Sequence, residues 1–157
     1  MVAPRGPFAP YNCPLMEISQ VRKQLKSAID QARAGSQQRR QRTSDAERTY
    51  AVFLDTVATP LVRQVANALK AEGYGFTVFT PGGGLRLADD RGRDDYLELT
   101  LDTTGDIPQV MVRTSRTRGS RTIEEERPLK KDAAPDTITE DDVLAILVDA
   151  LVPWLAR

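Results

Sequence analysis

Ser44 to Gly73 reads SDAERTYAVFLDTVATPLVRQVANALKAEG, and this stretch decides the fold of the chain. Its apolar residues recur at steps of three and four, which places them on one stripe of an α-helix. They are Tyr50, Phe53, Leu54, Val57, Leu61, Val62, Val65, Ala68 and Leu69. Pro60 lacks an N–H and crowds the carbonyl four residues before it. We therefore expect a kink near Thr59, or two helices that abut there.

Both ends of this predicted helix carry recognisable signals. Ser44 followed three residues later by Glu47 has the form of a capping box, in which the two side chains bind free backbone N–H groups. Lys70 lies in the last turn, and Gly73 can adopt the left-handed conformation that ends many helices. The helix is accordingly expected over residues 44–73.

Beyond Gly73 the hydrophobic period changes from 3.6 to 2, and turn residues separate five short segments. The predicted strands are residues 74–80, 85–88, 96–102, 107–114 and 121–127. Their connections are too short for parallel crossovers, so the pattern indicates an antiparallel meander. The last strand is so polar that we expect it at an edge of the sheet.

A final helix is expected after Thr139, which is followed by Glu140, Asp141 and Asp142 in the first turn, where negative charge suits the helix dipole. This helix is hydrophobic on most of its positions. Such a helix is buried on most sides or covers a partner. Pro153 is expected to bend or end it.

The predicted fold is α+β with two layers. A five-stranded antiparallel meander is covered on one face by the long, Pro60-kinked helix and the C-terminal helix, and an extra N-terminal helix precedes them. Residues 44–157 form this globular domain, and residues 16–43 form an amphipathic helix plus a basic linker. Residues 1–15 form a disordered, Pro-rich lead, which is either a flexible tail or an upstream extension if translation begins at Met16.

The N-terminal helix is expected over residues 17–34, with Gly35 ending it. Its apolar stripe is thin and consists of Ile18, Val21, Leu25, Ala28, Ile29 and Ala32. A helix this lightly hydrophobic packs at the edge of a domain or pairs with another chain.

Arginines cluster in the linker predicted over residues 35–43 and just before it. They are Arg33, Arg39, Arg40 and Arg42, and no acid lies between Asp30 and Asp45. One interpretation is an arm that binds nucleic acid, because clustered Arg neutralises phosphates and releases counterions. The favoured interpretation is a solvated linker between two helices.

A second set of candidate contacts lies in the predicted sheet. One hairpin carries Arg113, Arg116, Arg118 and Arg121, and the strand phases place Phe79, Arg86, Tyr96, Met111 and Arg113 on the face away from the helices. Aromatic and Arg side chains on an open sheet can stack on bases and hold phosphates. The favoured alternative is an amphipathic sheet with scattered surface residues.

Composition excludes several kinds of chemistry. The 157 residues include 22 basic and 22 acidic side chains, one Cys and no His. Catalytic sets that use His, metal sites with His ligands and zinc ribbons are therefore excluded. The acidic turn over residues 89–95 lacks the spacing of a calcium loop and is expected to be a solvated hairpin tip. We assign no catalytic, cofactor-binding or metal-binding residues.

The sequence thus favours a small non-enzymatic interaction module, adaptor-like or chaperone-like, that binds a protein partner or itself. The alternative is an accessory protein that binds nucleic acid through the two Arg clusters, and an enzyme ranks third. A single Cys suits the reducing cytoplasm. No apolar run approaches the ~20 residues of a membrane span, so no membrane partner is expected.

Overall fold

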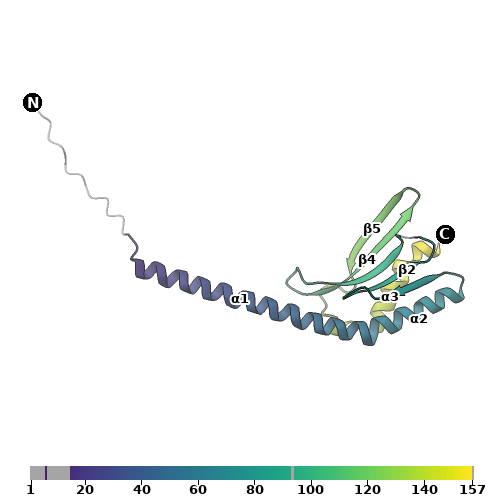
Figure 1. Cartoon of the computed structure of the whole chain (residues 1–157), viewed down its shortest axis with the longest axis horizontal. Helices are drawn as coiled ribbons and strands as arrows, with labels where there is room; N and C mark the ends of the chain where they lie inside the picture. Colours follow the sequence, from purple (N-terminus) through teal and green to yellow (C-terminus); the bar gives the residue numbers. More distant parts are fainter. Residues whose placement is uncertain (1–5, 7–14, 93, 157) are drawn as a thin grey trace, which may run out of the picture. The chain divides into compact units, whose positions relative to one another are not determined.

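The computed structural model of the chain describes residues 6, 15–92 and 94–156 (Figure 1). The chain divides into two units, residues 1–39 and residues 40–157, which we describe separately. The predicted lead over residues 1–15 lies outside the described residues, apart from Gly6 and Leu15.

The first helix, α1 (Ile18–Phe53), continues through residues 35–43. The predicted linker, the helix end at Gly35 and the capping box at Ser44 are therefore wrong, since all of them lie inside this helix. A helical Gly costs only about 1 kcal/mol relative to Ala, and the Gln and Arg residues that follow are good helix formers. In the absence of Pro, this cost does not end the helix.

A π-helical turn, η1 (Leu54–Ala58), separates α1 from α2 (Thr59–Ala71). The Thr59 N–H donates to the carbonyl of Leu54, five residues earlier. Pro60 follows at the second position of α2, where a missing N–H is tolerated. The predicted irregularity near Thr59 is confirmed, and its form is a widened turn.

The π turn changes which residues of the segment reach the core. The extra residue in this turn rotates the following helix, so two residues that the predicted stripe lacks are buried. They are Ala58 and Ala66, whereas the burial of Val62 and Leu69 agrees with the predicted stripe. Among the other predicted residues, Ala68 is exposed, and Val57, Leu61 and Val65 are half-buried and pack against the core.

The end of α2 confirms the stop signal at Gly73. Gly73 has a φ of +89°, its N–H donates to Lys70 O at 3.1 Å, and the Tyr74 N–H donates to Leu69 O at 2.8 Å. These two bonds form a Schellman motif, which requires the left-handed conformation that Gly adopts at low cost.

Five antiparallel strands form the sheet in the described part of the chain. They are β1 (Phe76–Phe79), β2 (Leu85–Asp89), β3 (Tyr96–Asp102), β4 (Gln109–Arg118) and β5 (Arg121–Pro128), and their order in the sheet follows the sequence. The predicted meander is confirmed, and the polar β5 is an edge strand as expected. β4 starts two residues later than predicted and extends to Arg118, before a turn at Gly119 (φ +66°).

One face of the sheet is buried under helices. Its inward side chains include Leu85, Leu87, Leu97, Leu99, Val110 and Val112, which are all nearly inaccessible to solvent. They form one core with residues of α2 and of α3 (Glu140–Leu155), and these two helices lie on the same side of the sheet in Figure 1. The two-layer α+β architecture is therefore confirmed.

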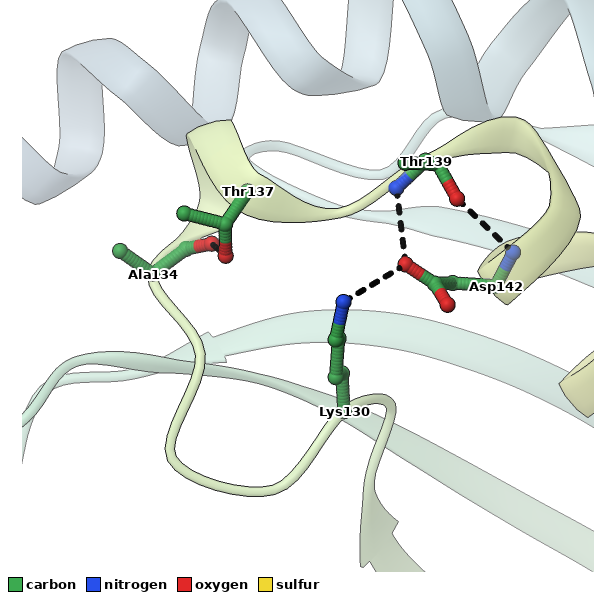
Figure 2. A network of polar contacts seen from close by, with 5 residues as sticks. All are labelled: Lys130, Ala134, Thr137, Thr139 and Asp142. Carbon is green, nitrogen blue, oxygen red and sulfur yellow. Dashed lines mark hydrogen bonds and ion pairs between the residues drawn. The ribbon is translucent and has the colours of Figure 1, made fainter.

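The start of α3 is fixed by a reciprocal cap (Figure 2). The Asp142 N–H donates to Thr139 Oγ1 at 3.3 Å, and the Thr139 N–H donates to Asp142 Oδ2 at 3.0 Å. Lys130 Nζ, from the loop after β5, also donates to Asp142 Oδ2 at 3.2 Å. The backbone hydrogen bond from Thr139, followed by that from Lys130, lowers the pKa of Asp142. At the other end, α3 continues through Pro153 to Leu155.

A tyrosine joins α1 to the centre of the sheet within the second unit. The buried hydroxyl of Tyr50 donates to Leu99 O in β3 at 3.0 Å. Burial, with a smaller effect of the Glu98 charge, raises the pKa of Tyr50 well above its ordinary value. Tyr50 therefore stays neutral in the folded chain at pH values that ionise an exposed tyrosine.

We predict that Thr139→Ala lowers the free energy of unfolding by about 1 kcal/mol, because the Asp142 N–H loses its acceptor. Thr139→Ser keeps the acceptor oxygen and should retain most of the stability. Urea unfolding of the three proteins at neutral pH measures both effects. Equal losses in the Ala and Ser variants would contradict a capping role.

We predict that Tyr50→Phe lowers the free energy of unfolding by about 1 kcal/mol at neutral pH, because one buried hydrogen bond is lost. Above the ordinary tyrosine pKa of 10.0, Tyr50 ionises only in the unfolded wild-type chain, so wild-type stability falls as pH rises. The variant lacks this contribution. The difference between the two proteins in urea unfolding should therefore shrink above pH 10.0, and a constant difference would contradict the assignment.

Candidate interaction surfaces

The open face of the sheet brings together the residues that strand phase predicted there. Cross-strand pairs join Phe79 to Arg86, Arg86 to Glu98, and Glu98 to Arg113. Tyr96 pairs with Ala88 and Met111 with Thr100 on the same face. Directly paired residues share a face of a sheet. Phe79, Arg86, Tyr96, Met111 and Arg113 therefore line one surface.

The Arg86 side chain contacts two neighbours on this face. Its guanidinium carbon lies 4.1 Å from the centre of the Tyr96 ring, and its Nη2 lies 3.2 Å from Glu98 Oε1. The Glu98 side chain is only 12% exposed and that of Arg86 is 38% exposed. Arg86 Nε is buried without a hydrogen-bond partner in the described part of the chain. The ring contact and the ion pair therefore hold this guanidinium.

A pocket of about 590 Å³ lies beside Arg86. Its lining consists of Phe79, Thr80, Pro81, Arg86, Ala88 and Tyr96. The volume lies in the range of small-ligand pockets. Sequence reasoning identified three of these residues, and it missed Thr80, Pro81 and Ala88 because none of them carries a distinctive functional group.

Arg113 faces the same side but is also paired with an acid. Its Nη2 lies 3.1 Å from Glu124 Oε2 on β5, and this hydrogen bond raises the pKa of Arg113. Its direct cross-strand neighbours are Glu98 and Glu126. Carboxylates around both open-face arginines reduce the attraction of this surface for phosphate.

The four arginines of the β4–β5 hairpin do not form one cluster. Arg116 is an odd number of residues from Arg113 and so lies on the opposite face of β4, across from Ile123. Arg118 and Arg121 are paired directly with each other beside the turn, and both are exposed. In the described part of the chain, these three arginines make no ion pair.

The linker arginines are all exposed on α1. Arg33 and Arg39 belong to the first unit, and Arg40 and Arg42 to the second. At about 100° per residue, Arg33 and Arg39 lie about 120° apart around the helix in the first unit, and Arg40 and Arg42 lie about 160° apart in the second. Arg39 Nη2 donates to Ser36 Oγ at 3.3 Å. In neither unit do the linker arginines share one side of the helix.

The first unit carries an exposed apolar stripe. We call residues 18–39 of α1 the arm. Its large apolar side chains are Ile18, Val21, Leu25 and Ile29, and they are 72%, 39%, 57% and 49% exposed. Their spacing of three, four and four places them on one side of the helix. This stripe is the one predicted from the sequence.

A second exposed apolar stripe lies on α3, in the second unit. Leu144, Val148 and Val152 are spaced four residues apart and are 41%, 53% and 52% exposed. An adjacent side of α3, about 100° away around the helix, is buried in the core through Val143, Leu147 and Leu151. The broadly hydrophobic helix expected from the sequence therefore covers the core with one side and presents apolar residues to solvent with another.

The acidic turn between β2 and β3 departs from the expected solvated tip. Asp95 is only 2% exposed, and Asp89 is buried as well. Asp95 Oδ1 accepts from the Thr117 N–H at 2.6 Å, and Asp95 Oδ2 accepts from Trp154 Nε1 at 3.3 Å. These donors compensate for burial of the carboxylate. Asp95 therefore joins the turn to β4 and α3.

Comparison with known proteins finds no match: no protein-family model, no curated protein and no solved structure is significantly similar to this chain.

Within residues 15–92 and 94–156, no helix is long and apolar enough to cross a membrane. The same residues contain no group of three or more Cys, Asp or Glu side chains arranged to hold a metal ion.

We predict that Arg86→Met lowers the free energy of unfolding by roughly 1–3 kcal/mol, because it leaves the largely buried Glu98 carboxylate without its partner. Arg113→Met is the matched control on the same face. Its ion pair with Glu124 is solvent-exposed, so stability should hardly change. Urea unfolding of both variants tests this contrast, and equal losses would contradict a special role for Arg86.

Proposed function

We propose that this protein is a non-enzymatic, cytoplasmic protein-binding module that associates with itself through the arm. The observation that carries the proposal is the exposed stripe of Ile18, Val21, Leu25 and Ile29. Fully burying such a side chain contributes about 1.5–3 kcal/mol. Four of them can therefore provide several kcal/mol for association, against the entropy cost of bringing two chains together.

The spacing of the stripe also supports this function. Steps of three and four form a continuous seam along a helix, the pattern by which one helix packs on another. The side of the arm away from this seam is polar and carries Lys23 and Ser27. A helix with one apolar side and one charged side is suited to binding while remaining soluble when unbound.

The nucleic-acid alternative has less support from the geometry. Arg86 and Arg113 are paired with carboxylates, and in neither unit do the linker arginines share one side of the helix. A single basic face is the usual electrostatic footprint of a nucleic-acid-binding protein. Protein binding therefore remains the first proposal.

We predict that Leu25→Asp weakens self-association of the full chain by at least about tenfold, because a carboxylate would be buried in the contact. Light scattering of the chain over a range of concentrations should give a mass above the monomer for wild type and a lower mass for the variant. Ser27→Asp adds the same charge on the far side of the helix and should leave the mass unchanged.

A wild-type mass equal to the monomer at all concentrations would contradict the proposal. So would equal masses for wild type and Leu25→Asp. If the chain instead binds random oligonucleotides at low salt and releases them as salt is raised, the nucleic-acid alternative replaces it.

A further inference from the structure

The proposed self-association leaves open which surface receives the arm. Resting on that proposed function, we infer that the arm of one copy packs on the exposed stripe of α3 in a second copy. The receiving surface is Leu144, Val148 and Val152, with the acidic first turn of α3 beside it.

The two stripes are similar in kind, and the stripe on α3 is somewhat shorter than that on the arm. Leu144 to Val152 spans eight helical steps, or about 12 Å at 1.5 Å per residue. Ile18 to Ile29 spans eleven steps, or about 16 Å. Each stripe is a single row of branched aliphatic side chains along a helix, so the two rows can interdigitate as ridges and grooves do between packed helices.

The charges beside the stripes are opposite in sign. α3 contains Glu140, Asp141, Asp142 and Asp149 and no basic residue. The arm contains Arg22, Lys23, Lys26, Arg33 and Arg39 and only one acid, Asp30. Complementary charge steers encounter and disfavours wrong partners. This asymmetry makes an acidic helix the preferred partner of the arm.

The acids that would meet the arm are available for it. Asp142 is paired with Lys130, and Asp149 with Arg127. Glu140 and Asp141 are exposed and make no ion pair in the described part of the chain. On the arm, Arg22, Lys26 and Arg33 are spaced four and seven residues apart, so they form one basic row beside the apolar stripe. The basic row can therefore approach the free acids when the apolar stripes are in contact.

Pairing of two arms with each other is disfavoured by the same charges. Each arm carries five bases against one acid, so an arm–arm contact would place like charges side by side. The contact with α3 instead neutralises charge on both partners. Every copy carries one arm and one α3 stripe, so the two surfaces are present at equal concentration.

Photo-crosslinking tests the contact directly. Leu25 is replaced by p-benzoylphenylalanine in the full chain, which is mixed with an isotopically labelled wild-type chain and irradiated. We expect crosslinked peptides that join the arm of one copy to the labelled tryptic peptide following Lys131, which contains all of α3. The same probe at Ser27, on the far side of the arm, should give at least about tenfold less of this product. Crosslinks from arm to arm, or from Leu25 to α3 of its own copy only, would overturn the inference.

A substitution in α3 separates this inference from the proposed function. Val148→Asp should weaken self-association by at least about tenfold, as Leu25→Asp does. Ile107→Asp, at an exposed apolar residue in the loop before β4, should have no effect. If Leu25→Asp abolishes association and Val148→Asp does not, the receiving surface is wrong while self-association through the arm stands. If wild type does not associate at all, both proposals fail together.

Discussion

Pro60 cannot donate a backbone hydrogen bond, and the helical segment over the sheet is built around this constraint. On an uninterrupted α-helix at about 100° per residue, Val62 and Leu69 would face roughly 140° away from Tyr50 and Phe53. The π turn over Leu54–Ala58 adds one residue to the turn and removes about 100° of that difference. Both groups are therefore buried against the same leucine face, so the widened turn is what allows one segment to cover the sheet with two successive helices.

Much of this fold follows from local patterns in the sequence. Alternation of Leu97, Leu99 and Leu101 with polar residues predicts the bounds of β3, and short turns predict the antiparallel order. The burial of Ala58 and Ala66 could not be predicted in the same way, because a period of 3.6 assumes that every turn is α-helical. The continuity of α1 was missed for another reason. Gly35 and Ser44 resemble end signals, but each is a weak preference that the surrounding helix formers outweigh.

The candidate surfaces also combine features that the sequence predicts with features that it does not predict. Strand alternation places Phe79, Arg86 and Tyr96 on one face, since the period of a strand is two. The ion pair of Arg86 with Glu98 depends on cross-strand register, which the sequence does not display. Burial of Asp95 depends on Trp154, which is 59 residues away in the chain. Contacts between residues so distant leave no periodic signal.

The two edges of the sheet have a consequence for the proposed self-association. β1 is only four residues long, and β5 carries three consecutive glutamates at Glu124–Glu126. A short edge and a charged edge are poor templates for adding strands from another chain, which is the first step toward a cross-β fibre. If copies associate as proposed, they would therefore contact one another through helices and not through sheet edges. The local concentration of the chain could then rise without an equal rise in amyloid formation.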